Sequence, residues 1–171
     1  SFTAEIFYRR DDADRAGCLF GNGHSAGYEG IAAVKVLADG SVELMLTGDN
    51  IGVGGNSSDI ITAAAPDDTG WHHLAFTYDG TNVKTYIDYN LANTTAPTYY
   101  NGRIFSGYAY FQLGWSNAGA PDYYHLGDID ELRFSDTVLA PTEFLGAAVP
   151  EPATIALMTI GGVFLARRRK R

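Results

Sequence analysis

The chain has 171 residues and a net charge of −8, which is enough length for one domain with a substantial core and too little for two large ones. Five of its twelve basic residues stand at 167–171, whereas nineteen of its twenty acidic residues precede residue 150, so the chain up to that point carries a net charge of −12. A body this acidic repels phosphate backbones, which excludes nucleic acid as an expected partner.

Cys18 is the only cysteine, so the chain has neither an internal disulfide nor a CxxC pair for zinc or redox chemistry. Its position in the apolar run GCLF favours a buried thiol, and pairing between exported chains is the alternative. The sequence opens on SFTAEIFYRR without an initiating Met, and we therefore expect it to be the C-terminal part of a longer product.

Short apolar stretches separated by turn residues run through the first 134 residues. They predict strands at 2–9, 28–37, 41–47, 71–78, 83–89, 109–115 and 127–134. Asp39-Gly40 and the DGTN sequence at 79–82 predict hairpins, while the Gly-rich residues 47–59 indicate a loop. The one short helix expected is APTEFLGAA at 140–148, with Pro141 in its first turn and Gly146 placed to end it.

These elements predict an all-β fold, an antiparallel β-sandwich of the jelly-roll type with eight or so strands. Val42, Leu44 and Leu46 share one face of their strand, and two-faced strands of this kind are typical of antiparallel sheets with one wet side. Two Trp, eleven Tyr and nine Phe supply bulky side chains for the core.

Two segments resemble the laminin-G-like jelly rolls of the concanavalin A-like lectin and glucanase superfamily. GWHHLAFTYDGTNVKTYIDYN at 70–90 is similar to the central hairpin of that family, and GDIDELRFSDTVLAPTEF at 127–144 is similar to its last strand and the segment after it. The matching positions of the second segment are Gly127, Ile129, Asp130, Glu131, Arg133, Leu139 and Glu143. The resemblance implies a jelly roll over residues 1–147, with the family's first strands preceding Ser1.

Tyr89 and Asn90 stand where the family usually has Gly after the Asp of the second turn. Because Asn tolerates positive φ, we expect the turn to shift by one residue. At the start of the same hairpin, Trp71 is expected to lay its indole over the core. Alternation places His72 and His73 on opposite faces of their strand, so they cannot act as a pair, and a structural or surface role is expected for each.

Catalysis is the first function to weigh. GDIDE resembles the acidic strand of laminarinase-type glycosidases, which use Glu-x-Asp-x-Glu to place two carboxyl groups about 5 to 5.5 Å apart. Asp128 and Asp130 share a face, but the next position on that face is Leu132 and Glu131 points away. The set is incomplete, so no catalytic residue is predicted.

Calcium is the one cofactor for which the sequence offers ligands, because jelly rolls of this superfamily often hold Ca²⁺ at a sheet edge. The three candidate ligands are Asp49, Asp59 and Asp128, with Asn50, Asn56 and Asp122 as further oxygen donors. The spacing does not match an EF-hand loop, and solvated acidic loops are the alternative explanation.

Carbohydrate contacts use exposed aromatic faces together with amides and carboxylates. One loop-like stretch, GWSNAGAPDYYH at 114–125, supplies the five candidate ligand-binding residues Trp115, Asn117, Asp122, Tyr123 and Tyr124. TYYNGR adds Tyr99, Tyr100 and Asn101. Core filling is the alternative role for these aromatic side chains.

The C-terminal residues 148–171 differ from the rest of the chain. Val149, Pro150, Glu151 and Pro152 are followed by an uncharged segment at 153–166 and a basic end consisting of Arg167, Arg168, Arg169, Lys170 and Arg171. Fourteen helical residues reach about 21 Å against roughly 30 Å of hydrocarbon, so the segment is a short transmembrane helix at most, held by cytoplasmic cations.

The arrangement of these three parts resembles the PEP-CTERM sorting signal of exported bacterial proteins. The resemblance implies an exosortase-type membrane protease as a partner, cleavage near 150–152, and an inner-membrane anchor that precedes delivery to the cell surface or extracellular matrix. The prolines keep such a site extended, while Gly161-Gly162 weakens the short helix.

Taken together, the sequence predicts a non-enzymatic exported module that binds polysaccharide or another surface protein. A glycan-processing hydrolase of the same superfamily and a purely structural surface protein are the two alternatives. Hydrolysis of β-glucans that depends on Asp128 or Asp130 would identify the first, and a glycan array without signal would favour the second.

Overall fold

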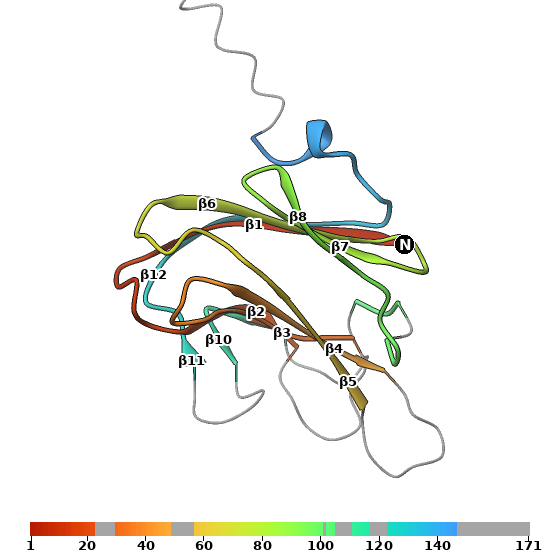
Figure 1. Ribbon diagram of the computed structural model, residues 1–171, viewed down its shortest axis with the longest axis horizontal. Helices are drawn as coiled ribbons and strands as arrows, with labels where there is room; N and C mark the ends of the chain where they lie inside the picture. Colours follow the sequence, from red (N-terminus) through yellow and green to blue (C-terminus); the bar gives the residue numbers. More distant parts are fainter. Residues whose placement is uncertain (23–29, 49–56, 101, 105–110, 117–122, 147–171) are drawn as a thin grey trace, which may run out of the picture.

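The computed structural model describes residues 1–22, 30–48, 57–100, 102–104, 111–116 and 123–146. These residues contain twelve strands and a single 3₁₀ turn, and the strands form two stacked sheets (Figure 1). The predicted all-β antiparallel sandwich is confirmed.

The first sheet has five strands in the order β12-β1-β6-β7-β8, all antiparallel. Their bounds are β1 Phe2–Arg10, β6 Trp71–Tyr78, β7 Val83–Ile87, β8 Asn90–Thr95 and β12 Gly127–Ser135. The second sheet has the order β10-β11-β2-β3-β4-β5, and β9 pairs with the remaining length of β2. Its strands are β2 Gly17–Gly21, β3 Gly30–Val36, β4 Val42–Gly48, β5 Ser57–Ala63, β9 Gln112–Leu113, β10 Trp115–Ser116 and β11 Tyr123–Tyr124. One pairing departs from the predicted antiparallel pattern, because β11 runs parallel to β2.

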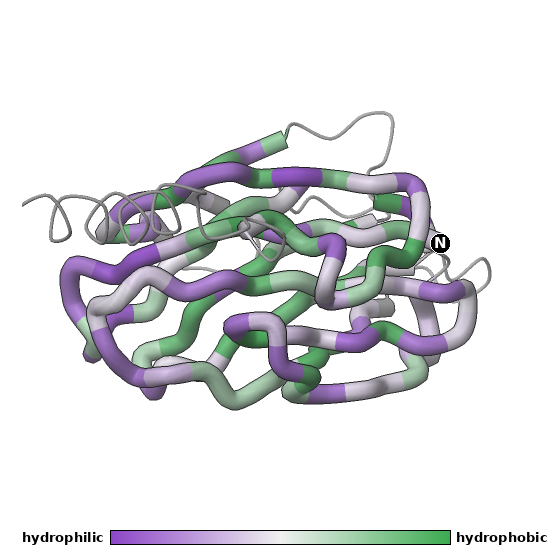
Figure 2. The backbone as a smooth tube through the Cα atoms, turned by 90° about the horizontal axis from the view of Figure 1, so that it is seen from above, coloured by the Kyte–Doolittle hydropathy of each residue, from purple (hydrophilic) through white to green (hydrophobic). Residues whose placement is uncertain are grey.

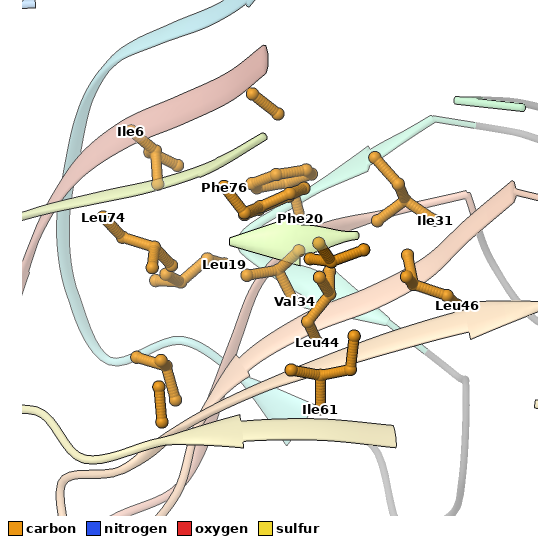
Figure 3. Close-up of a cluster of buried hydrophobic side chains, with 14 of the residues drawn as sticks. Ile6, Leu19, Phe20, Ile31, Val34, Leu44, Leu46, Ile61, Leu74 and Phe76 are labelled. Atoms are coloured by element: carbon orange, nitrogen blue, oxygen red, sulfur yellow. The ribbon is translucent and has the colours of Figure 1, made fainter. Parts of the chain in front are cut away.

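The core lies between the sheets, where alternate side chains of the long strands point inward except at the bulges of β3 and β12. On β1 the inward residues are Phe2, Ala4, Ile6 and Tyr8, each at most 1% exposed. Figure 3 shows the two inner faces meeting, with Ile6, Leu74 and Phe76 from the first sheet and Leu19, Phe20, Ile31, Val34, Leu44, Leu46 and Ile61 from the second. Apolar backbone segments accordingly run through the middle of the molecule and polar ones around its rim (Figure 2). Cys18 is a buried thiol, as predicted, and its Sγ lies 3.4 Å from Val34 O.

The two predicted hairpins are present, with Gly40 at φ +83° and Gly80 at φ +101° in their turns. The turn between β7 and β8 does not shift to Asn90, contrary to expectation. Instead Asp88 and Tyr89 occupy it with φ of +47° and +68°, a mirror-image tight turn in which both central residues are left-handed. Tyr89 tolerates this strain because its ring stacks on His73 at 4.7 Å.

Residues 136–146, named here the C-terminal strap, cross the outer face of the first sheet (Figure 1, blue segment). Phe144 is only 2% exposed and packs on Ala75 and Tyr86 of that face. Over the described residues 140–146, the expected helix is therefore wrong beyond one 3₁₀ turn at Pro141–Glu143, since Phe144 is extended, and residues 147–148 lie outside the described part of the chain. The physical reason is that burying Phe144 against the sheet outweighs the local helix signal.

The strap is fastened to a charged group that no sequence pattern singles out. Glu5, fully buried on the outer face of β1, accepts hydrogen bonds from Arg133 Nε at 2.6 Å and from the backbone N–H of Leu145 at 2.6 Å. His73 Nε2 lies 3.1 Å from the same carboxylate. Burial acts to raise the pKa of Glu5, but these hydrogen bonds outweigh it and hold the pKa below its usual value.

The sequence patterns miss four strands, namely β2, β5, β8 and β11. Residues 57–59 were assigned to a loop, yet they begin β5, in which Ile61 and Ala63 face the core. β8 is a mostly exposed edge strand without apolar alternation. The single strand expected at 109–115 is interrupted at Gly114 (φ +72°), which separates β9 from β10.

Candidate functional site

The candidate site lies at one edge of the second sheet, where β10 and β11 form a small antiparallel hairpin. Trp115 pairs with Tyr124 across it, and Ser116 pairs with Tyr123. The positive φ of Gly114 turns the chain into β10, and its N–H donates to Leu19 O at 2.8 Å, which ties the hairpin to β2. The stretch predicted to be loop-like is thus partly strand.

Close approach of β11 to β2 depends on a glycine. A Cβ at Gly17 would lie 2.8 Å from His125 Cα, so only glycine admits the parallel pairing of Tyr124 with Cys18. His125 Nε2 donates to Arg9 O at 3.0 Å and so fastens the end of β11 to the first sheet. Burial lowers the pKa of His125, which keeps the imidazole neutral at pH 7 and suits it to this structural role.

Trp115 and Tyr124 form an aromatic pair on the outer face of the sheet. Their ring centroids are 6.2 Å apart with an interplanar angle of 27°, and Tyr124 is 57% exposed. In-register neighbours on a sheet share a face, and Tyr124 neighbours Cys18, which packs with Ala33 outside the main core. The pair therefore presents aromatic surface to solvent rather than filling the core.

Polar groups accompany this pair. Trp115 Nε1 and Gln112 Oε1 are buried and, among the described residues, have no hydrogen-bond partner. Further along the outer face the Lys35 ammonium lies 3.1 Å from the Glu43 carboxylate, with Lys35 in register with Cys18. This part of the sheet thus combines the exposed Tyr124 ring with the polar groups of Trp115 and Gln112 and the Lys35–Glu43 ion pair. Small polar ligands bind at sites that combine apolar surface with a few polar groups in this way.

The other candidates for carbohydrate contact do not join this site. Asn117 and Asp122 lie outside the described residues, as does Asn101, and of Tyr123 only the backbone pairing is described. Tyr100 is 6% exposed and fills the core, while Tyr99 is 46% exposed but held at β5, at the other edge of the sheet.

The two described candidates for calcium ligands, Asp59 and Asp128, lie far from each other. Asp59 accepts backbone N–H groups of Thr98, Tyr99 and Tyr100 at 2.7–2.9 Å, which anchors that loop to β5. Asp128 lies on β12, at the opposite edge of the sandwich from β5 and β8.

Asp49 lies outside the described residues. Within the part of the chain that the structure describes, no three His, Cys, Asp or Glu side chains are grouped to hold a metal.

The acidic strand differs from its sequence pattern. Asp128 and Asp130 do share the outer face, opposite Arg9 and Phe7. A bulge with Glu131 at φ +47° then places Arg133, and not Leu132, next on that face, and Leu132 packs against the core. Asp128 accepts a hydrogen bond from the Arg9 guanidinium. Asp130 Oδ1 accepts a hydrogen bond from the backbone N–H of Glu131 at 2.9 Å.

The neighbouring histidines also have separate partners. His72 lies between Asp88 and Asp68 at 2.9 Å each, whereas His73 contacts Glu5 on the opposite face. Their predicted separation is confirmed. The expectation for Trp71 is wrong, since the residue is 49% exposed, on the outer face of the first sheet. Alternation explains this, because Leu74 and Phe76 face the core and residue 71 has the other parity.

Comparison with known proteins assigns two segments of the chain to described families. A family model described as the concanavalin A-like lectin/glucanases superfamily matches residues 1–144, and the PEP-CTERM protein-sorting motif matches residues 148–171. A search of curated proteins returned no match. Among the described residues, no helix has the length and apolar character needed to cross a membrane, and the sorting motif lies outside them.

Solved structures show the same fold at low identity. The carbohydrate-binding module CBM40 of the Ruminococcus gnavus IT-sialidase, bound to α2,6-sialyllactose, has a TM-score of 0.61 and 16% identity, covering 85% of this chain and 82% of that one. Domain 4 of the GH43 arabinanase AbnA from Geobacillus stearothermophilus, in complex with arabinotriose, has a TM-score of 0.52 and 22% identity over 83% and 63% of the two chains. A botulinum neurotoxin type C structure, described as interacting with two gangliosides, has a TM-score of 0.58 and 12% identity, and this chain spans only 33% of it. With the family model matching most of its length, the chain belongs to the concanavalin A-like lectin/glucanases superfamily and ends in a PEP-CTERM protein-sorting motif.

Proposed function

We propose that this protein is an exported, non-enzymatic carbohydrate-binding module whose ligand contacts the Trp115–Tyr124 pair. The observation that carries the proposal is the exposed Tyr124 ring stacked on Trp115 at a sheet edge. A sugar ring would lie with its C–H face on the exposed aromatic surface that Tyr124 presents at this edge.

The fold neighbours support this proposal without identifying the ligand. One was solved with sialyllactose and another with arabinotriose, so different sugars are bound by proteins with this architecture. The strong net negative charge of this chain favours uncharged sugars over acidic ones.

The aromatic pair can be tested with the full chain in mild detergent on a glycan array, followed by calorimetry with the best ligand. Tyr124→Ala is expected to weaken binding about tenfold or more, as removal of an exposed aromatic anchor does. Tyr99→Ala, which removes a comparably exposed tyrosine from the other edge, is the matched control and leaves affinity unchanged. Equal affinities of wild type and Tyr124→Ala would contradict the proposed site.

The same preparation separates the binding module from its two alternatives. Incubation with β-glucans tests for turnover, and hydrolysis abolished by Asp128→Asn or Asp130→Asn would replace the binding proposal with a hydrolase. An array without signal, with and without Ca²⁺, would instead favour a structural surface protein.

For the C-terminal motif, we propose recognition by an exosortase-type membrane protease and cleavage near Pro150–Pro152. The protein would be held in the inner membrane by residues 153–166 and the cations at 167–171, and then delivered to the cell surface or extracellular matrix. The match of the sorting motif to residues 148–171 supports this order of events.

A further inference from the structure

The C-terminal strap leaves one end of the outer face of the first sheet uncovered. There Asp128, Arg9 and Trp71 stand in register on the neighbouring strands β12, β1 and β6. Arg9 and Asp128 have side-chain exposures of 41% and 52%, and the Trp71 residue is 49% exposed. Three different strands thus place a cation, a carboxylate and an indole side by side on an accessible surface.

The three side chains are linked to one another. The Arg9 guanidinium bonds to the Asp128 carboxylate, lies 3.9 Å from Asp11, and is centred 5.9 Å from the middle of the Trp71 ring. The buried Arg9 Nε has no partner among the described residues. Because these residues stand on paired strands and not on loops, their spacing is set by the sheet.

A contribution to stability alone accounts poorly for this arrangement of Asp128, Arg9 and Trp71. An exposed ion pair and an exposed cation–π contact each contribute little to the free energy of unfolding. Leaving Trp71 half exposed forgoes much of the stabilisation that burial of its apolar area would add. The same sheet buries Phe144 elsewhere on this face, so the fold does cover aromatic side chains where nothing else uses them.

We propose that Trp71, Arg9 and Asp128 form a second carbohydrate-contact surface, one that takes an uncharged sugar. This inference rests on the proposed function and extends it. The indole offers a flat apolar surface to the C–H face of a sugar ring, and the guanidinium and carboxylate offer planar donors and acceptors to its hydroxyl groups. Asp128 and Asp11 together outweigh the charge of Arg9, so a sialic acid or uronic acid would be repelled.

The second surface lies close to the first along the chain. Tyr124 ends β11 on the second sheet, and four residues later Asp128 is on β12 of the first, so the chain crosses between the sheets at this edge (Figure 1). The hydrogen bond from His125 to Arg9 O fixes that crossing. Because the two surfaces are on outer faces of opposite sheets, one molecule can hold two polysaccharide segments and cross-link a matrix.

The test uses the full chain in mild detergent with three probes: a soluble neutral β-glucan, a neutral arabinan and sialyllactose. Trp71→Ala is expected to lower the affinity for a neutral polymer about tenfold and to abolish the turbidity that cross-linking produces. Trp71→Phe should retain most of the affinity. Leu91→Ala is the matched control, since it removes a 57% exposed apolar side chain from the same sheet and should change nothing.

The outcomes separate this inference from the proposed function. If the wild type binds and Tyr124→Ala weakens binding while Trp71→Ala does not, the second surface is refuted and the first stands. If only Trp71→Ala weakens binding, the Trp115–Tyr124 site is refuted and the second surface stands. Stronger binding of sialyllactose than of both neutral polymers contradicts the proposed sugar class, and no binding of any probe contradicts both sites. Circular dichroism of each variant shows that a loss of affinity is not a loss of fold.

Discussion

His72 is a single residue whose protonation is coupled to folding. Burial acts to lower its pKa, but the carboxylates of Asp88 and Asp68, each 2.9 Å from one ring nitrogen, outweigh that effect and raise it. Both nitrogens face acceptors, which is the arrangement that the doubly protonated imidazolium satisfies. The folded state therefore binds the proton more tightly than the unfolded chain, whose histidine has a pKa near 6.5.

We predict that the stabilising effect of His72 is full below pH 6.5 and is lost as the pH rises through the higher pKa of the folded state. Urea unfolding of the wild type between pH 6 and 9 should show the free energy of unfolding falling in this window. In His72→Gln the fall should be absent. His125 acts in the opposite direction, because its pKa is lowered in the folded state and stability rises as the unfolded chain loses this proton near pH 6.5. The effect of His72 is therefore the difference between the wild type and His72→Gln at each pH, and a difference that does not shrink as the pH rises from 6 to 9 would contradict the prediction.

Single residues also show where sequence reasoning succeeds and where it fails. The opposite faces of His72 and His73 follow from alternation alone, and the structure confirms them. The same alternation places Trp71 outside the core, but a large aromatic side chain was expected to be buried. Tyr89 keeps a left-handed conformation that favours glycine because its ring stacks on His73 and its hydroxyl donates to Leu145 O at 3.0 Å. Such long-range compensation leaves no trace in the local sequence.

At the scale of elements, the C-terminal strap behaves as part of the sandwich. Thr3 Oγ1 donates to Thr137 O and accepts from Leu139 N at its start, and Glu5 accepts from Leu145 N at its end. Between them Phe144 is buried on the sheet. The strap therefore covers apolar surface that would otherwise face water.

Glu5→Gln is predicted to lower the free energy of unfolding by about 2 kcal/mol. An amide has one acceptor oxygen, so it cannot satisfy Arg133 on one side and both His73 and Leu145 N on the other. Breaking a fully buried ion pair costs more, about 3–5 kcal/mol, but Arg133 is 36% exposed and water compensates part of the loss.

The matched control for Glu5→Gln is Glu143→Gln, which alters an exposed carboxylate in the same strap. It should cost at most about 0.5 kcal/mol, in line with surface substitutions. Urea titration of both variants gives the comparison, and hydrogen exchange at Leu145 N shows whether the strap detaches first. Equal effects of the two substitutions would mean that the buried carboxylate does not hold the strap.

Most long strands could be predicted from the sequence, because one face of each is apolar and glycine or aspartate marks its turn. β5 was missed, since its first residues lie in a Gly- and Ser-rich run, and the polar edge strand β8 has no alternation to detect. The aromatic candidates Trp115 and Tyr124 were identified as residue types. Their stacking depends on a parallel pairing of β11 with β2 that Gly17 permits, and such a pairing joins residues about a hundred positions apart.

At the scale of the whole molecule, the fold ends close to the sorting motif. The last described residue, Gly146, follows the anchored Leu145, and the uncharged segment of the tail starts at residue 153. Six residues separate them, and at about 3.3 Å each they span at most roughly 20 Å. A protease acting near Pro150 must therefore reach its site beside a folded domain, close to the outer face of the first sheet.

We predict that Pro150→Ala combined with Glu151→Ala leaves the protein uncleaved in the membrane fraction of a bacterium that carries an exosortase-type protease. The two changes remove the fixed φ of one proline and the acidic residue between the two prolines, while the apolar segment and its cations remain. Intact mass and fractionation of membrane and medium provide the readout. Thr154→Ala with Thr159→Ala is the control, because it leaves the motif intact and makes the segment more apolar, and it should be processed like the wild type. Normal cleavage and release of the Pro150/Glu151 variant would remove the proposed protease as a partner. If Glu5→Gln, with its motif unchanged, is processed faster than the wild type, the docked strap limits access to the site.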